Sequence, residues 1–245
     1  MRLVRPRVPG VRRGAGLSET DRIKRAYGSL DERAIARWDP RNAGNQRILA
    51  ERRRLTLRLL QRAGWVPLGD RRVLDVGSGG GAELAWFREL GANESALVGI
   101  DLLPERIDAA RRAHPHLEFH LGNAEHLPFP DGSFDLVLAY TVFSSILDAG
   151  MAANVSSEIR RVMRPGGGFL WYDFRYDSPA NRNVRGVSEA RVRAMFPDLS
   201  GELIGLTLLP PLARRLGPLT PIAYPALARV PPLRSHLLGL LRKAA

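Results

Sequence analysis

Apolar residues recur at two different spacings along this chain. Up to residue 63 the spacing is helical. One helix is predicted to start after Ser18, because Ser18 and Asp21 have the form of a capping box. A second helix is predicted over residues 45–63, with Gly64 as its stop signal. After Pro67, short apolar runs alternate with helical stretches. Strands are predicted at 72–76, 96–101, 117–121, 134–139 and 168–174, and helices at 82–90, 104–113 and 151–163.

Strands separated by helices of this length favour right-handed crossovers and a parallel sheet covered on both faces. A helix at 188–195 with Ser188 as its N-cap, a strand at 203–209, a proline-rich helical section at 210–232 and a last apolar run at 235–242 follow. We therefore predict an α/β fold, a doubly wound, Rossmann-like, mostly parallel sheet of about seven strands with a C-terminal helical insertion.

The predicted domain organisation is a flexible basic arm at 1–18 followed by a single domain at 19–245. Within that domain, N-terminal helices occupy 19–64, a core 70–175, and a cover with the last strands 176–245. The length of 245 residues and the 44% share of hydrophobic residues suit one sizeable core. The absence of cysteine excludes disulfides, thiolate zinc sites and cysteine nucleophiles.

Stretches without a charged residue are too short to span a membrane, because the longest has 13 residues and a spanning helix needs about 20. The basic N-terminus also lacks the apolar segment of a signal peptide. The expected location is therefore the cytoplasm, and contact with a membrane surface stays open as an alternative.

The net charge of +12 is concentrated at the two ends of the chain. Residues 1–18 carry five arginines and no acid, and residues 201–245 carry six basic residues against Glu202 alone. The stretch between them is nearly balanced, with 26 basic and 24 acidic residues. No specific nucleic-acid partner is expected from this distribution.

A glycine-rich loop follows the first predicted strand. Gly77 allows a tight turn, Gly79 lets the backbone approach a ligand, and Gly81 leads into a helix N-terminus, which favours a carboxylate or phosphate. Gly77 and Gly79, with Ala82, also satisfy the G-x-G-x-x-A pattern of dinucleotide-binding proteins. On its own the loop leaves the choice of cofactor open.

Polar residues at the ends of the next two strands narrow that choice. Asp101 ends the second strand, where its carboxylate can accept both hydroxyls of a ribose, and Leu102 can lie against a purine. Asp101 as a cap for the helix that starts at Pro104 is a compatible alternative. Asn123 follows the third strand and can donate and accept hydrogen bonds at an adenine edge.

With these pieces in this order, residues 45 to 175 resemble the class I S-adenosylmethionine-dependent methyltransferases, in particular the group related to the quinone-biosynthesis methyltransferases. The loop from Asp75 to Gly81 looks like the family's D-x-G-x-G-x-G motif, and 165–168 like its P-G-G turn. Asn123 stands where aspartate is more usual. The resemblance implies S-adenosyl-L-methionine as cofactor and N-terminal helices, with Trp38 and 42–45, that fold over it as a lid. The cofactor-binding residues it implies are Asp75, Gly77, Ser78, Gly79, Gly81, Asp101, Leu102, Asn123, Ala124, Glu125 and Tyr140.

The acceptor in this topology is expected above the carboxyl ends of the fourth and fifth strands. The sulfonium cofactor makes its methyl group electrophilic, so the protein has to orient the acceptor and needs no covalent nucleophile. Asp173 is the predicted general base, and a cap or a salt bridge to Arg175 is its alternative role. Predicted substrate-binding residues are Thr141, Ser144, Tyr172, Arg175, Asn181 and Arg185. No metal site is expected, because the histidines do not have ligand spacing.

The sequence therefore predicts methyl transfer to a small molecule or glycan, with O-methylation favoured and natural-product or polysaccharide biosynthesis as the setting. The alternatives are an RNA or protein methyltransferase that uses the basic tails, and a cofactor-binding subunit without activity of its own. The proline-rich section 210–232 is predicted either to wall an apolar substrate or to rest on an anionic membrane.

Overall fold

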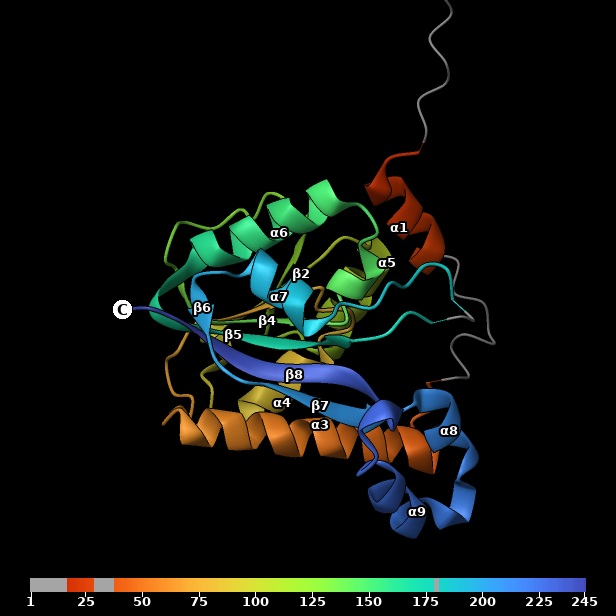
Figure 1. Ribbon diagram of the computed structural model, residues 1–245. Coiled ribbons are helices and arrows are strands. Elements are labelled where there is room, and N and C mark those ends of the chain that lie inside the picture. Colours follow the sequence, from red (N-terminus) through yellow and green to blue (C-terminus); the bar gives the residue numbers. More distant parts are fainter. Residues whose placement is uncertain (1–16, 29–37, 179–180) are drawn as a thin grey trace, which may run out of the picture.

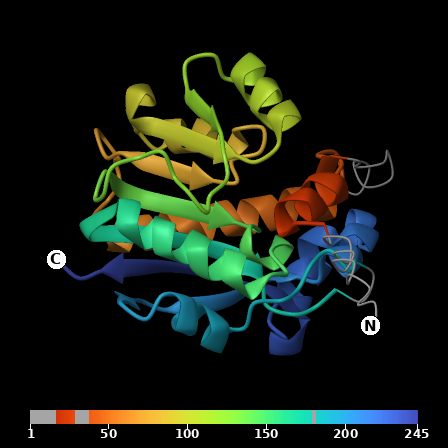
Figure 2. The same cartoon turned by 90° about the horizontal axis from the view of Figure 1, so that it is seen from above.

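A computed structural model describes residues 17–28, 38–178 and 181–245, so most of the predicted basic arm lies outside the described residues. Its centre is an eight-stranded sheet with the order β3-β2-β1-β4-β5-β8-β6, with β7 paired to β8 off this path (Figures 1 and 2). The parallel strands are β1 (Val73–Val76), β2 (Leu97–Asp101), β3 (Glu118–Leu121), β4 (Phe134–Tyr140) and β5 (Met163–Phe174). The antiparallel part consists of β8 (Arg234–Lys243), which pairs with β5, with β6 (Leu199–Ser200) and with β7 (Leu203–Leu208). The mostly parallel α/β sheet is as predicted, and the strand beyond the expected seven is the two-residue β6.

Helices cover both faces of this sheet. Two of them, α6 (Ala149–Val162) and α7 (Glu189–Met195), lie on one face, and α3 (Ala43–Arg62) and α4 (Ala82–Glu89) lie on the other (Figure 1). The remaining crossover helix, α5 (Pro104–Ala113), packs on β2 and β3. Each face has its own core, one centred on Phe143, Phe169 and Trp171 and the other on Leu60, Trp65 and Phe87. No helix among the described residues is both long and apolar enough to span a bilayer.

The glycine-rich turn before the fifth strand differs from its prediction. The strand was predicted to begin at residue 168, after this turn. In the structure β5 already begins at Met163, which pairs with Phe134, and pairing resumes where Gly168 lies opposite Leu136. The residues between form a bulge in which Gly166 has a φ of 72°. The P-G-G segment is therefore a bulge within β5 and does not precede the strand.

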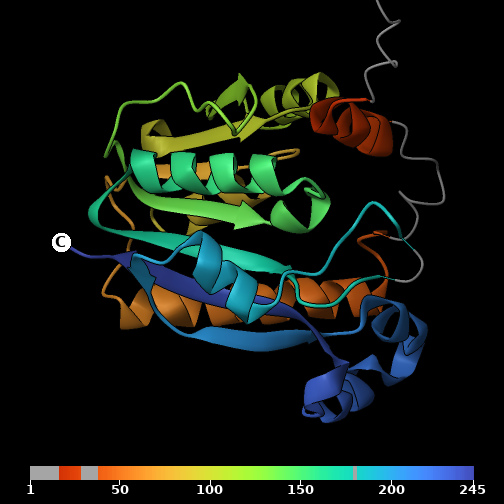
Figure 3. The same cartoon turned by 45° about the horizontal axis from the view of Figure 1, so that its top comes forward.

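The two N-terminal helices have different positions. The first, α1 (Glu19–Gly28), begins at Ser18, whose Oγ accepts from the Asp21 N–H as predicted. It lies at the edge where the parallel strands end (Figure 3). The second, α3, is capped by Asn42 and packs along the sheet against β7 and β8. Residues 42–45 thus form the cap and first turn of a helix that packs along the sheet, and their predicted part in a lid over the cofactor stays a prediction.

A helical platform follows β7, as predicted for the proline-rich section. We call residues 210–233 the platform; they comprise α8 (Pro210–Arg215), η3 (Gly217–Leu219), α9 (Thr220–Leu227) and η4 (Pro231–Leu233). Ile48, Leu208, Ala213 and Tyr224 form a small core between the platform and α3. The backbones approach so closely that a Cβ on Gly44 would lie 2.2 Å from the carbonyl oxygen of Ala213. The platform is therefore fixed to the start of α3.

Candidate active site

The glycine-rich loop lies between β1 and α4, as the sequence indicated. Gly77, Gly79 and Gly81 all have positive φ, at 74°, 52° and 82°, which explains why the loop needs glycine there. The backbone N–H groups of Gly77 and Ser78 donate to the carbonyl of Ile100 and attach the loop to the end of β2. Two neighbouring strands therefore fix the position of the loop.

One side of the loop is packed and the other is open. A Cβ on Gly77 would lie 2.7 Å from Val142 Cγ2, and one on Gly81 would lie 2.6 Å from Phe119 Cζ. A Cβ on Gly79 or on the next residue, Gly80, would meet nothing within 4 Å. The backbone at these two glycines therefore faces space that a ligand can enter.

Asp101 lies beside the open side of the loop, as predicted. Its Oδ2 accepts from the Gly79 N–H at 2.9 Å, and its Oδ1 accepts from the Leu103 N–H at 3.0 Å, just before α5. Each carboxylate oxygen has a second lone pair and can accept one further hydrogen bond. Asp101 thus stabilises the start of the helix and keeps acceptor capacity for a diol.

A cavity of about 280 Å³ adjoins Asp101 at the carboxyl edge. It is lined by Leu102, Pro104, Leu121, Gly122 and Asn123 from the sheet side and by Thr20 and Lys24 of α1. The Asn123 side chain bridges these parts, because its Nδ2 donates to Glu125 Oε2 at 3.0 Å and lies 3.4 Å from Thr20 Oγ1. Ala124 packs on the core, and the Glu125 carboxylate also accepts from Asn154 at 2.9 Å. Apart from Thr20, Lys24 and the Asn123 amide the cavity walls are apolar, which suits a flat heterocycle.

Asp75 and Tyr140 are buried beneath the loop. Burial, with the Glu83 and Asp101 carboxylates nearby, raises the pKa of Asp75 well above its usual value. Arg52 of α3 pairs with Glu83 and lies 4.9 Å from the centroid of the Tyr140 ring. Burial is the largest single influence and opposes the charge of Arg52, but the Glu83 and Asp75 carboxylates and the two tyrosines together outweigh it and raise the arginine's pKa. A buried cation thus lies among carboxylates next to the cofactor loop.

The segment after β4 forms the predicted acceptor side. Thr141 has a φ of 57°, an uncommon conformation for a non-glycine residue, and its N–H donates to the carbonyl of Tyr172. Asp173 is fully buried: its Oδ2 accepts from the Ser144 N–H at 2.9 Å, and its Oδ1 accepts from the Phe174 N–H at 2.8 Å. Burial raises the pKa of Asp173 to about 6, against these hydrogen bonds. The structure therefore shows Asp173 holding the 3₁₀ turn at Ser144, and its role as a base stays a prediction.

Tyr172 points to the opposite face from Asp173, since neighbouring residues of a strand alternate. Its hydroxyl lies 3.0 Å from Thr207 Oγ1, and its ring stacks on His236 at 4.6 Å between centroids. Burial raises the pKa of the Tyr172 hydroxyl to about 12. Tyr172 is thus part of the layer under α3 and does not line the same surface as Ser144.

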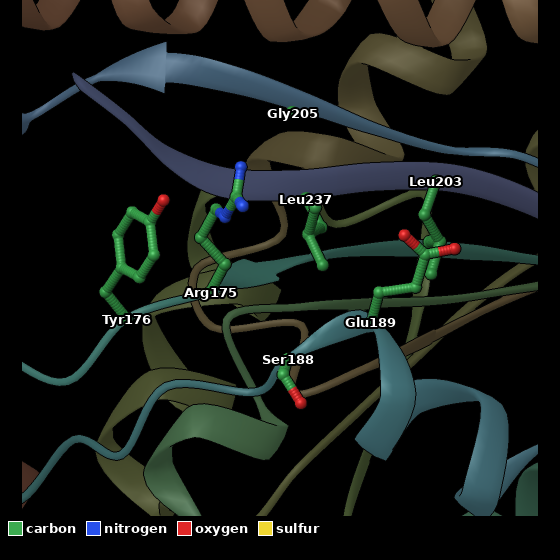
Figure 4. A pocket seen from close by; sticks show the side chains of 7 residues that line it. All are labelled: Arg175, Tyr176, Ser188, Glu189, Leu203, Gly205 and Leu237. Carbon is green, nitrogen blue, oxygen red and sulfur yellow. The ribbon is translucent and has the colours of Figure 1, made fainter. Parts of the chain in front are cut away.

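Arg175 lines a second pocket, of about 220 Å³, between the end of β5, the start of α7 and strands β7 and β8. Leu203, Gly205 and Leu237 form its apolar wall, and Tyr176, Ser188 and Glu189 complete the lining (Figure 4). The Arg175 guanidinium lies 4.7 Å from the Tyr176 ring centroid. Among the described residues no carboxylate lies within ion-pair distance of Arg175, so the predicted alternative of an Asp173–Arg175 salt bridge is wrong.

Asn181 and Arg185 lie on the loop that leads to α7. Asn181 Oδ1 accepts from the Asn183 N–H, and the Arg185 N–H donates to the carbonyl of Ser144 at 2.8 Å. The Arg185 guanidinium also reaches the carbonyl of Leu147 at 3.3 Å. The loop therefore lies against the turn after β4, which brings Arg185 to the predicted acceptor side.

The N-terminal helices were assigned to a lid from the sequence, but no site residue of α1 was named, and none of α3 beyond residues 43–45. Arg22 donates to the carbonyl of Ser145 at 2.5 Å, and Glu19 accepts from the Leu147 N–H at 2.6 Å, so α1 is bonded to the turn after β4. Arg52 follows Ile48 by four residues and therefore lies on the same face of the helix, so the sequence did contain a signal for its burial. The two bonds of α1 to the turn after β4 join residues more than 120 positions apart and leave no local pattern.

The middle of the chain is similar to known methyltransferases. Residues 74–171 match the family model described as a methyltransferase domain. Over 113 residues the chain is 41% identical to the fatty-acid O-methyltransferase of Mycolicibacterium smegmatis, covering 44% of this chain and 40% of that protein. Over 118 residues it is 38% identical to phthiotriol/phenolphthiotriol dimycocerosates methyltransferase 1 of Mycobacterium ulcerans, covering 45% and 40%. The match thus spans about two fifths of the length of these relatives.

A solved structure extends the likeness in fold to nearly the whole chain. Geranyl diphosphate C-methyltransferase from Streptomyces coelicolor, solved with Mg²⁺, geranyl diphosphate and S-adenosyl-L-homocysteine, superposes with a TM-score of 0.61 at 18% identity. The superposition covers 94% of this chain and 100% of that one. At this identity the likeness concerns the fold.

The residues present fit S-adenosyl-L-methionine. The open backbone at Gly79 and Gly80 leaves room for its methionine part, Asp101 keeps acceptor capacity for the ribose diol, and the cavity at Leu102 and Asn123 suits adenine. The family match begins in β1 and ends in β5, so it includes the glycine loop, Asp101 and Asn123. Residues 74–171 of this chain therefore form a methyltransferase domain of the class I S-adenosylmethionine-dependent family.

Proposed function

We propose that this protein transfers the methyl group of S-adenosyl-L-methionine to an oxygen of a small, largely apolar molecule with a polar or anionic head. The observation that carries the methyl transfer is the open glycine loop beside Asp101 and the adjoining cavity. S-adenosyl-L-methionine supplies an electrophilic methyl group when bound. The protein's own residues have to hold the acceptor in line and exclude water.

The pocket at Arg175 supports an acceptor of this kind. It has one cation without a carboxylate partner among the described residues, above an apolar wall of Leu203 and Leu237. Its volume of about 220 Å³ is below the roughly 300–1,000 Å³ of pockets that enclose a whole ligand. It therefore suits the head of an acceptor rather than the whole molecule. The names of the two curated relatives, which refer to a fatty acid and to phthiotriol dimycocerosates, agree with an apolar acceptor.

The role of Asp173 depends on the acceptor oxygen. A carboxylate acceptor is already deprotonated at neutral pH and needs no base. A hydroxyl acceptor has to lose a proton, and Asp173, at the end of β5, is the base we propose for it. Asp173→Asn should thus preserve methylation of a carboxylate and abolish methylation of a hydroxyl. Loss of both activities together with a lower melting temperature would leave Asp173 only its role in holding the turn at Ser144.

Cofactor binding is tested first, by calorimetry with S-adenosyl-L-homocysteine. Asp101→Asn should weaken its affinity by about tenfold or more, because hydrogen bonds to a charged group contribute roughly 1.5–3 kcal/mol. Asp108→Asn, on the exposed surface of α5, removes the same charge and should leave the affinity unchanged. Binding of NAD in place of S-adenosyl-L-homocysteine would overturn the proposal.

The acceptor is tested with isotope-labelled S-adenosyl-L-methionine and mass spectrometry. Fatty acids, phenols and sugars are offered separately to the wild-type protein and to Arg175→Gln. We expect label in the apolar acceptors and an increased KM for an anionic acceptor in Arg175→Gln, with S-adenosyl-L-homocysteine binding unchanged. Label in sugars alone would refute the apolar acceptor and restore the glycan alternative.

A further inference from the structure

The exposed surface of the platform has an unusual composition. Its exposed side chains are all proline, apolar or arginine: Pro211, Arg215, Pro218, Leu219, Pro221, Ile222, Ala226, Arg229, Val230, Pro231 and Pro232. No acidic residue occurs between residues 203 and 245. Protein surfaces in water normally mix charges of both signs. A surface with only apolar and cationic side chains is therefore matched to a partner that is apolar and anionic.

The apolar side chains on this surface are large and protrude. Leu219 is 65% exposed, Ile222 80% and Val230 44%. Trp38, which is 57% exposed, lies against α8 of the platform, because the Arg214 guanidinium is 5.4 Å from the centroid of its ring. Large exposed apolar side chains gathered on one segment of the chain point to an interaction site.

The platform is held rigidly beneath this surface. Tyr224 Oη donates to Glu51 Oε2 of α3 at 2.7 Å, and the Leu208 N–H donates to Tyr224 Oη at 3.3 Å. The small core beneath the platform is already filled by side chains that include Ile48 and Ala213. The exposed apolar side chains therefore stay on the surface.

The platform also lies at the edge of the sheet that carries the candidate active site. β7 is parallel to β5, because both are antiparallel to β8, so the platform starts at the carboxyl edge. The start of α3, to which it is attached, is at that edge as well, since the far end of α3 leads into β1. Figures 1 and 3 show α8 and α9 at the same end of the molecule as α1.

We propose that the platform docks on an anionic membrane surface, with Leu219, Ile222 and Val230 entering the headgroup region and Arg215 and Arg229 contacting the lipid phosphates. Apolar side chains flanked by arginines are suited to this interface, because the aliphatic stems of arginine lie along apolar surface while the guanidinium reaches the phosphate. Among the described residues, Arg215 and Arg229 have no carboxylate within ion-pair distance, so they are available to phosphate. Docking in this orientation brings the acceptor side to the bilayer. The use of this orientation for catalysis rests on the proposed apolar acceptor, whereas the docking itself is independent of the proposed function.

The test is flotation of the full chain with phosphatidylcholine vesicles that contain or lack phosphatidylglycerol. The wild-type protein should bind the anionic vesicles, and less at high salt. Arg215→Gln with Arg229→Gln should lower the partition coefficient by about 25-fold, because each basic residue near an anionic surface contributes about fivefold. Arg62→Gln with Arg112→Gln is the matched control: it makes the same charge change in the last turns of α3 and α5, at the opposite edge, and should leave binding nearly unchanged.

Insertion is tested separately from charge. Ile222→Ser should weaken binding by about tenfold with an unchanged melting temperature, since the side chain is exposed in the free protein. Brominated lipids should quench the fluorescence of Trp38, because the other three tryptophans are buried, and Trp38→Phe should remove the quenching.

Three results would overturn the proposal: no binding to anionic vesicles, an equal loss of binding in the control pair, or binding that Ile222→Ser leaves unchanged. A dimer in sedimentation that Ile222→Ser dissociates, without vesicle binding, would show instead that a second copy covers this face. Vesicle binding without methyl transfer to any apolar acceptor would retain the docking and refute the proposed function alone.

Discussion

The ion pair between Arg52 and Glu83 offers a direct test of how the layer under the cofactor loop is held together. Each side chain is only 16% exposed, and the Arg52 guanidinium also lies 4.9 and 5.1 Å from the ring centroids of Tyr140 and Tyr172. Arg52→Met keeps the length of the stem and leaves the Glu83 carboxylate without its cation, near Asp75. Removing one partner of a buried pair costs about 3–5 kcal/mol, so we expect the free energy of unfolding to fall by about 3 kcal/mol, the lower end, because some exposure remains.

A double variant separates the unpaired charge from the loss of contacts. Glu83→Leu alone should also cost about 3 kcal/mol, because it leaves Arg52 buried without a carboxylate. If the losses were independent, Arg52→Met with Glu83→Leu would cost about 6 kcal/mol. Because an apolar pair of similar volume replaces a buried ion pair at little cost, we expect about 1 kcal/mol instead. The assay is urea denaturation followed by circular dichroism, and additive losses would refute the reasoning.

Three further predictions follow from the same site. Gly79→Ala should lower the free energy of unfolding by about 1 kcal/mol because of its positive φ, and should lower the affinity for S-adenosyl-L-homocysteine at least tenfold. Gly81→Ala, whose Cβ would also strike Phe119, should lower the free energy of unfolding further in urea denaturation, and equal losses would contradict this. Burial raises the pKa of Asp173 to about 6, so protonation of Asp173 stabilises the folded state. Relative to Asp173→Asn, the free energy of unfolding should therefore rise by about 1 kcal/mol from pH 7 to pH 5, and a fall would show that the pKa is lowered instead. Glu19→Gln should speed amide exchange in the turn after β4 about tenfold, measured by mass spectrometry, while Glu89→Gln, exposed on α4, should not.

The parts of the site that the sequence predicted are those that local physics determines. A glycine loop between a strand and a helix needs positive φ at fixed positions, and Asp101 reaches it because neighbouring parallel strands end at one edge. The position of Arg52 on the apolar stripe of its helix was also encoded locally, since Arg52 follows Ile48 by four residues. The bond between Glu51 and Tyr224 spans 173 positions and depends on how the platform packs, which no local pattern expresses.

The acceptor has to be inferred from this chain's own residues, because the family match stops short of them. It ends at residue 171, before Asp173, Arg175 and the loop with Arg185. α1 and the platform also lie outside it. Two of these segments, α1 and the loop with Arg185, meet at the turn after β4, because Arg22 and Arg185 donate to successive carbonyls of that turn, at Ser145 and Ser144. We therefore expect substitutions at Arg175 to change the KM of the acceptor, and substitutions at Asp101 to change the KM of the cofactor.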